Sequence, residues 1–350
     1  MTARTYLRPI GPTVPAPGVD TIPCADRDDL AFTAAEMVTR RDAGREQSET
    51  LSAAEIRARA IADAAVAGLL SRHAADRAPL PGLPLDRPRI MGIVNVTPDS
   101  FSDGGQHAST QAAIAHALKL AAEGADILDI GGESTRPGSD AVSTDEELRR
   151  VVPVIEGLAG RTKALISIDT RKAEVMQRAL AAGAHIINDV AALTYEPACM
   201  EVAAASNAPI VLMHAQGDPR TMQAAPHYDD CLLDVYDWLE ARVAACEAAG
   251  IVRNRLIVDP GIGFGKTLDH NLELLAGLSI FHGLGVPLLL GASRKRFIGA
   301  LTGVTAAHQR VAGSIAAALQ GAAQGAQIMR VHDVAETRQA LTVWEAMRSA

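Results

Sequence analysis

The feature that most constrains the fold is a pattern repeated from Arg89 to the C-terminus, in which short apolar runs end in polar residues. The first segment, RIMGIVNVTPDSFSDGG, begins with an apolar run rich in β-branched residues. From Pro98 it continues as a polar loop that ends in two glycines. Later runs end in GGESTRPG, SIDT, INDV, VLMH, VDPGIGFGK, GASRK and MRVH. In parallel α/β proteins the catalytic and ligand-binding residues lie at the carboxyl ends of the strands, so these polar ends predict one shared site.

Strand-like and helix-like segments alternate along this part of the chain. The expected strands are 89–96, 126–130, 164–169, 185–189, 209–213, 255–259, 286–291 and 327–331. The expected helices are 109–123, 144–159, 171–182, 196–206, 229–249, 269–279, 306–323 and 333–348. This α/β pattern predicts a (β/α)8 TIM barrel. A doubly wound sheet is the alternative, but its ligand loops would cluster at one switch point, whereas nearly every strand end here is polar.

Residues 1–88 differ from the barrel region and are predicted to form an N-terminal, partly helical extension. Two helix starts carry matching capping boxes, Thr33 with Glu36 and Ser52 with Glu55. We expect the helix from Ser52 to run to about residue 70.

The proline-rich segment 79–88 is predicted to be a linker between this extension and the barrel. The extension has no cluster of catalytic-type residues. We therefore expect its helices to bury their apolar faces on the barrel exterior, away from the catalytic loops. Packing on another subunit is the alternative.

Composition narrows the class of protein. The chain has 350 residues, 48% of them hydrophobic, which suffices for a large core. Its 33 basic and 41 acidic side chains give a net charge of −8, so no general basic field attracts nucleic acid. Four cysteines show no CxxC spacing, and the sequence has no long uncharged apolar span. The first residues, MTARTYLRPIG, lack the apolar core of a signal peptide, so we expect none. We expect a cytoplasmic protein without nucleic-acid or membrane partners.

Five motifs in this order, MGIVNVTPDSFSDGG, DIGGESTRPG, SIDT, DPGIGFGK and SRK, resemble those of dihydropteroate synthase. The resemblance covers the chain from about Arg89 onward. It implies a folate-biosynthesis transferase and sulfonamide target. The implied reaction condenses 6-hydroxymethyl-7,8-dihydropterin diphosphate with p-aminobenzoate to give 7,8-dihydropteroate and diphosphate. GIGFGK alone would be weak evidence, because it lacks the glycine spacing of the common phosphate-loop fingerprints.

The pterin ring presents a planar edge of N–H donors and ring nitrogens, which a buried carboxylate can bind through two hydrogen bonds. Asp259 is the first candidate, with Asp169 and Asn188 beside it, since an amide can donate and accept at once. The resemblance assigns the pterin pocket to these three residues and Lys295. Taken singly, Asp169 could be a helix cap and Asp259 a turn residue; several such residues on separate strand ends favour a site.

Two apolar residues, Met213 and Phe264, are candidates for packing against the ring, although such residues are ordinarily core. Ser293, in the same SRK motif as Lys295, is placed among the substrate-binding residues. The next residue is Arg296, where many family members have serine, so this chain departs from the family pattern near the p-aminobenzoate end of the site.

A diphosphate leaving group needs positive charge. Arg330 and His332 lie two residues apart at the last strand end, so their side chains share a face, and a helix N-terminus follows. The resemblance places diphosphate contacts at both residues and at Asn95. It also implies that Asn95 contacts Mg²⁺, a cofactor that prefers oxygen ligands and substrate phosphates. A structural role in the loop is the alternative for Asn95.

The first two strand-end loops are glycine-rich and suit lids that close over substrate. In the family the Thr-Arg pair of STRPG approaches the second substrate, which maps to Thr135 and Arg136. For Asp99, Ser102 and Asp103 a surface-turn role stays open.

The expected mechanism is charge stabilisation, because no nucleophilic triad is evident. We predict that diphosphate departs first and that the aniline nitrogen then attacks the pterin methylene carbon. The proposed catalytic residues are Asn95, Lys295, Arg330 and His332. A methyltetrahydrofolate–corrinoid methyltransferase and a non-catalytic pterin-binding paralogue are alternatives, and the RVH constellation counts against the first. We expect a homodimer.

Overall fold

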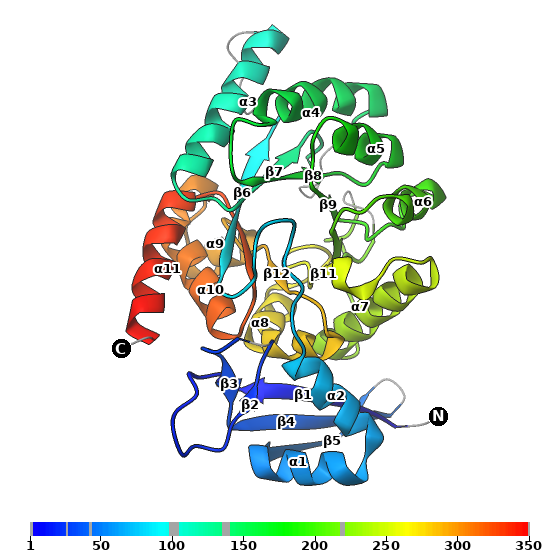
Figure 1. Cartoon of the computed structure of the whole chain (residues 1–350), viewed down its shortest axis with the longest axis vertical. Coiled ribbons are helices and arrows are strands. Elements are labelled where there is room, and N and C mark those ends of the chain that lie inside the picture. Colours follow the sequence, from blue (N-terminus) through cyan, green and yellow to red (C-terminus); the bar gives the residue numbers. More distant parts are fainter. Residues whose placement is uncertain are drawn as a thin grey trace.

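The computed structural model describes residues 3–25, 27–41, 44–97, 105–134, 141–217 and 221–348, with the backbone alone for 105–108. Within these ranges eight parallel strands form a barrel surrounded by helices (Figure 1). The strands are β6 (Arg89–Asn95), β7 (Ile127–Gly131), β8 (Leu165–Asp169), β9 (Ile186–Asp189), β10 (Ile210–Met213), β11 (Leu256–Asp259), β12 (Leu289–Leu290) and β13 (Ile328–Val331). All the strands predicted from the sequence are present.

The barrel closes on itself. The strand order is β11-β10-β9-β8-β7-β6-β13-β12. A bridge between Val258 and Leu288 joins the two ends of this order, and the Val258 amide donates to the Pro287 carbonyl oxygen at 2.9 Å. The (β/α)8 barrel prediction is therefore confirmed over the doubly wound sheet.

The outer layer consists of helices that follow the strands (Figure 1). They are α3 (Gly105–Ala122), α4 (Thr144–Leu158), α5 (Ala173–Ala181), α6 (Pro197–Ala205), α7 (Cys231–Ala248), α8 (Leu268–Ala276), α9 (Arg296–Thr302), α10 (Val311–Ala323) and α11 (Val334–Arg348), with 3₁₀ turns η2 (Arg253–Arg255), η3 (Leu278–Leu284) and η4 (Ala307–Gln309). Sequence analysis missed the short α9, and it began the following helix too early, since Val311 rather than residue 306 starts α10. None of these helices in the described ranges is both long and apolar enough to cross a membrane.

One end of the barrel is sealed by the segment 79–88. Leu80 and Leu85 are buried in a cluster with apolar residues from the amino-terminal part of each strand. Leu80 and Leu83 also exchange two backbone hydrogen bonds of 2.9 Å. This segment is therefore the floor of the barrel as well as a connection, and the polar strand ends lie at the opposite, carboxyl end.

The extension contains an antiparallel sheet that sequence analysis did not predict. Its strands β1 (Arg4–Ile10), β4 (Ala34–Arg41) and β5 (Gly44–Ser52) pair in the order β1-β4-β5, and β2 (Ile22–Pro23) pairs with β3 (Ala31–Phe32). The helix predicted from Thr33 is therefore wrong. Residues 34–41 are hydrogen-bonded on both sides, and this pairing outweighs the local capping signal of Thr33 and Glu36.

A helix does begin at Ser52, where the Ser52 and Glu55 side chains form a capping box. This helix, α1 (Ala53–Ala62), ends at Asp63, whose carboxylate accepts the Ala65 and Val66 amides and starts α2 (Ala64–Ala74). Two helices thus replace the single one expected. Ile56 is fully buried in a separate apolar cluster of the extension.

The extension packs against α7 through charged side chains. Four carboxylates lie three or four residues apart and so share one face of α7. We call this set the acidic stripe: Asp230, Asp234, Asp237 and Glu240. Arg4, Arg40 and Arg45, from the three strands of the extension sheet, form ion pairs with it. Since Asp230 caps the start of α7, these contacts extend closer to the carboxyl end of the barrel than we expected.

Further contacts join the extension to η3, next to the barrel floor. The Ser279 hydroxyl donates to the Pro9 carbonyl oxygen at 2.7 Å, and Arg72 Nε donates to the Gly283 carbonyl oxygen at 2.5 Å. The four cysteines are unpaired and buried, in agreement with a packing role.

Candidate active site

The centre of the carboxyl end is an arginine held by two aspartates from different strands. Arg330 Nε donates to Asp129 Oδ2 at 2.7 Å, and its Nη2 donates to Asp169 Oδ2 at 2.6 Å. Asp129 is fully buried in β7 and Asp169 ends β8. Sequence analysis did not single out Asp129, although a carboxylate inside the apolar run ILDIG was a usable signal.

Burial and charge act against each other in this group. Burial raises the pKa of Asp169; Arg330 lowers it, and Asp129 raises it further. Burial alone would lower the pKa of Arg330, but Asp129 and Asp169 raise it above its ordinary value. Arg330 therefore stays charged and compensates the buried carboxylates.

The predicted pterin residues Asn188 and Asp259 also lie toward the carboxyl ends of their strands, β9 and β11. Asn188 Nδ2 donates to Asp129 Oδ2 at 3.0 Å, so Asn188 joins the Arg330 group. Asp259, at the end of β11, accepts the Gly261 amide on Oδ1 at 2.7 Å. Burial raises its pKa, while Lys295 lowers it. Asp129 Oδ1 is buried and has no hydrogen-bond partner among the described residues.

Lys295 contacts Phe264, which lies in the loop after β11. Lys295 Nζ lies 4.2 Å from the centroid of the Phe264 ring and donates to the Ile262 carbonyl oxygen. Burial lowers the pKa of Lys295 to about 7, opposed by Asp259. The loop needs glycine at 261, where φ is +68° and a Cβ would lie 1.9 Å from the His214 carbonyl oxygen.

Behind this loop lies a buried pair that sequence analysis did not identify. Lys266 Nζ is 2.9 Å from His214 Nδ1 and donates to the Phe264 carbonyl oxygen at 3.0 Å. Burial lowers the pKa of Lys266 to about 7 and that of His214 to about 2, the latter helped by Lys266. The pair therefore supports the Phe264 loop from beneath. Met213, just before His214, is buried at the end of β10.

His332 is oriented by Ser293. The Ser293 Oγ accepts the His332 amide at 3.2 Å and lies 3.1 Å from His332 Nδ1. When the hydroxyl donates to Nδ1, the imidazole proton is on Nε2, where it can serve as a donor. Arg294 Nε holds Asp333 at 3.0 Å and so ties the SRK loop to the start of α11. The geometry gives Ser293 a positioning contact, in addition to the substrate contact predicted for it.

Some predicted residues lie outside the described ranges: Pro98, Asp99, Ser102, Asp103, Thr135 and Arg136. The two sides of the second loop are nevertheless fixed. Glu133 Oε1 accepts the Val142 amide at 3.0 Å, and Lys172 Nζ donates to the Val142 carbonyl oxygen at 2.7 Å. Lys172 lies three residues after Asp169, so both sides of this loop are tied to the segment that follows β8. Arg296, the first residue of α9, is exposed.

Asn95 ends β6, between β7 and β13, the strands that carry Asp129 and Arg330. It offers one amide oxygen, the kind of ligand Mg²⁺ accepts. No group of three or more His, Cys, Asp or Glu side chains within the described ranges could hold a metal alone. This donor set fits a metal held largely by substrate phosphates and water.

Comparisons with known proteins agree with this geometry. Residues 91–332 match the family described as pterin binding enzyme. The dihydropteroate synthase of Escherichia coli strain K12 is 52% identical over 268 residues, covering 77% of this chain and 94% of the relative. The chain belongs to the dihydropteroate synthase family. The enzyme of Neisseria meningitidis serogroup B is 55% identical over 268 residues, covering 75% of this chain and 94% of the relative.

Solved structures show the same likeness. Xanthomonas albilineans dihydropteroate synthase with 4-aminobenzoic acid has a TM-score of 0.72 and 56% identity, covering 77% of this chain and 96% of that chain. The same enzyme with 7,8-dihydropteroate has a TM-score of 0.70 and 54% identity, with the same coverage. Yersinia pestis dihydropteroate synthase in a sulfonamide complex has a TM-score of 0.73 and 52% identity, covering 77% and 97%.

The family and fold predicted from the sequence motifs are thus confirmed. The enzyme is a transferase of folate biosynthesis that forms 7,8-dihydropteroate from a pterin diphosphate and p-aminobenzoate. Residues 1–90 lie outside the matched family region.

Proposed function

We propose that the pterin binds at the carboxyl end of the barrel, against Asp129, Asp169, Asn188, Asp259 and Lys295. The supporting observation is a set of buried acceptors with unused capacity, above all Asp129 Oδ1. A buried carboxylate oxygen without a donor is costly, and the N–H groups of a pterin edge would satisfy it. Met213 and Phe264 would supply apolar contacts to the ring.

The diphosphate would lie toward β13 and β6, at Arg330, His332 and Asn95. Arg330 uses Nε and one Nη2 hydrogen for the two aspartates, and a guanidinium carries five N–H donors. Donors on Nη1 are therefore left for a phosphate oxygen. His332, with Nδ1 turned to Ser293, would present Nε2 in the same direction along the strand end. Thr135 and Arg136 would approach the p-aminobenzoate from the second loop.

In the proposed reaction the C–O bond between the pterin methylene and the diphosphate breaks first. The electron pair leaves with the diphosphate, and Arg330 and His332 stabilise its charge. The pterin, held by the carboxylates, delocalises the resulting positive charge. The aniline nitrogen of p-aminobenzoate then forms the C–N bond and releases one proton.

Mg²⁺ is the proposed cofactor, with Asn95 as its protein ligand. When bound, the ion would neutralise part of the diphosphate charge. Support comes from the hard oxygen of Asn95 beside the strand that carries Arg330.

The test is turnover of the pterin diphosphate with p-aminobenzoate, followed by diphosphate release, with and without a chelator. Turnover that a chelator abolishes and added Mg²⁺ restores supports the proposed cofactor. Turnover that is unaffected by the chelator contradicts it.

We also propose a cytoplasmic homodimer. Four free, buried cysteines fit a reducing compartment. Val343 and Met347, one turn apart on α11, are 55% and 67% exposed and offer an apolar surface to a second copy. Light scattering of the wild type and of a Val343→Glu, Met347→Glu variant tests the dimer; a monomeric wild type would contradict it.

A further inference from the structure

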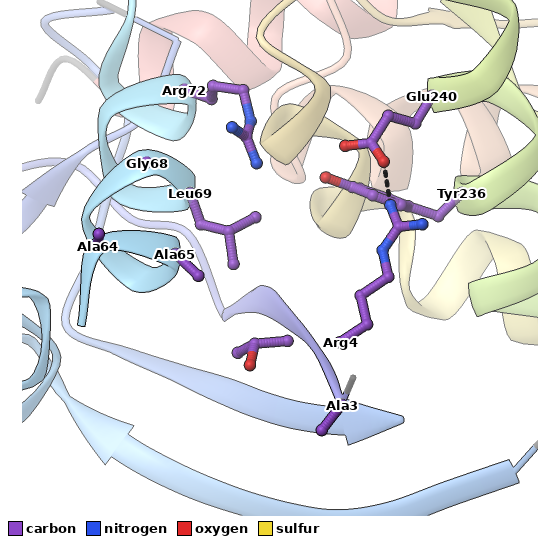
Figure 2. Close-up of a pocket in the computed structure, with 10 residues that line it drawn as sticks. Ala3, Arg4, Ala64, Ala65, Gly68, Leu69, Arg72, Tyr236 and Glu240 are labelled. Atoms are coloured by element: carbon purple, nitrogen blue, oxygen red, sulfur yellow. Dashed lines mark hydrogen bonds and ion pairs between the residues drawn. The ribbon is translucent and has the colours of Figure 1, made fainter. Parts of the chain in front are cut away.

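A cavity of about 500 Å³ lies between the extension and the barrel, apart from the strand-end site (Figure 2). Its walls come from the start of β1, from α2 and from α7. The α2 side is apolar and includes Ala64, Ala65 and Leu69, whereas β1 and α7 supply Arg4 and Tyr236. The volume is within the range of small-molecule sites, and one apolar wall facing polar groups is their usual composition.

The two arginines at this cavity differ in their partners. Arg4 is compensated by Asp237, at 2.8 Å, and by Glu240. Arg72 Nε donates to the Gly283 carbonyl oxygen, yet Arg72 makes no ion pair with the residues whose positions are described. Figure 2 shows its guanidinium directed into the space between α2 and α7. The cavity thus holds one positive charge without a counter-ion.

Tyr236 adds a second donor. Its side chain is 1% exposed, and its hydroxyl has no partner of acceptable hydrogen-bond geometry in the described part of the chain. Burial raises the pKa of this hydroxyl and so does Glu240, while Arg72 and Arg4 act in the opposite direction. The hydroxyl therefore stays protonated and lies near both guanidinium groups. A buried donor left unpaired is a cost that a ligand can remove.

We propose that this cavity is a binding site for a small organic carboxylate with an apolar body. The carboxylate accepts hydrogen bonds from the terminal N–H groups of Arg72 and from the Tyr236 hydroxyl, as charge-assisted pairs do. The apolar body packs against Ala64, Ala65 and Leu69. A phosphate dianion fits less well, because Glu240 lies beside the site and would repel the second charge.

The ligand would contact α2 of the extension and α7 of the barrel at once, and so hold them together. The test is calorimetry of the full-length protein with 3-phenylpropionate and with its uncharged amide, after the substrate site has been filled with 7,8-dihydropteroate. We expect one acid molecule per chain and at least about tenfold weaker binding of the amide. Equal binding of acid and amide, no binding of the acid, or loss of binding on adding dihydropteroate would each overturn the proposal.

Four variants locate the site. Arg72→Gln should weaken binding about tenfold or more, and Tyr236→Phe should weaken it by a smaller factor. Gly68→Leu should abolish it by filling the cavity. A Cβ at residue 68 meets only Arg72 Nη1, at 3.6 Å, and leucine favours the helix. Arg59→Gln removes an exposed charge of α1 outside the cavity and should bind like the wild type.

Circular dichroism shows whether each variant is folded. Wild-type affinity in both folded Arg72→Gln and Gly68→Leu proteins would place the ligand elsewhere and overturn the assignment.

Discussion

Replacing Arg330 by methionine tests whether this arginine is the counter-ion of the buried carboxylates. In the wild type it lies 2.7 Å from Asp129, which is fully buried, and 2.6 Å from Asp169, whose side chain is 10% exposed. Removing one partner of a buried ion pair costs about 3–5 kcal/mol, because the other charge is left without compensation. An exposed pair such as Arg59 and Glu49 contributes less than about 1 kcal/mol.

The pH dependence gives a second signature of the same change. Arg330 lowers the pKa of Asp169, so this pKa should rise when Arg330 is removed. The folded state then binds a proton that the unfolded state binds only below about pH 4. Between about pH 4 and the raised pKa of Asp169, the folded state carries more protons than the unfolded state. The free energy of unfolding therefore falls as the pH rises through this range. The stability deficit of the variant should therefore be larger at pH 8.5 than at pH 5.5.

Urea unfolding followed by circular dichroism measures the free energy of unfolding at both pH values. Arg59→Met is the matched control, and adding Asp129→Asn to the Arg330→Met protein should restore about 2 kcal/mol or more. A loss at pH 8.5 as small as that of the control, or a loss independent of pH, would refute the reasoning.

Three further outcomes are expected. Asp259→Asn should weaken pterin binding by about 2–4 kcal/mol, through loss of a charged acceptor, and unchanged affinity by calorimetry would remove it from the pocket. The difference in free energy of unfolding between the wild type and Lys266→Met should shift in favour of the wild type from pH 7 to pH 10, by up to about 1.4 kcal/mol per pH unit. The reason is that the lowered pKa of Lys266 lets the folded state lose its proton first; a pH-independent difference in urea unfolding would contradict this. A protein starting at residue 88 lacks Leu80 and Leu85, so its free energy of unfolding should be lower by at least about 3 kcal/mol than that of a protein starting at residue 78. The folded fraction should retain turnover. A folded, pterin-binding protein without turnover would show instead that the extension shapes the active site.

The barrel could be predicted from sequence because each of its strands is a short apolar run followed by polar residues. The strand expected at 164–169, for example, is Leu165–Asp169 in the structure. The extension could not be predicted in the same way. At Thr33 a local capping signal competes with strand pairing, and that pairing depends on β1 and β5, which local sequence does not specify.

The residues of the candidate site differ in the same way in how far the sequence could predict them. Asp169, Asn188 and Asp259 stand at strand ends, where their position marks them, whereas Lys295 was predicted from the resemblance of the SRK motif. Asp129 lies inside the run ILDIG rather than at its end, so it was missed, and its ion pair joins it to Arg330, about two hundred residues away in sequence. Such a contact exists only once the barrel has closed.

The barrel floor has a consequence for the order of folding during synthesis. The first barrel strand, β6, finds one of its two neighbours in β13, which is made almost last. Until that strand leaves the ribosome, Leu80 and Leu85 have no complete ring of strands to cover, and the acidic stripe that the extension contacts is itself made only from residue 230 onward. The first 74 residues, by contrast, contain a sheet, two helices and an apolar cluster of their own. We expect these residues to fold early and to remain undocked from the barrel until it is complete. Nascent chains stalled after residue 200 should then yield a protease-resistant fragment of about this length. The junction between extension and barrel should become protease-resistant only near the end of translation.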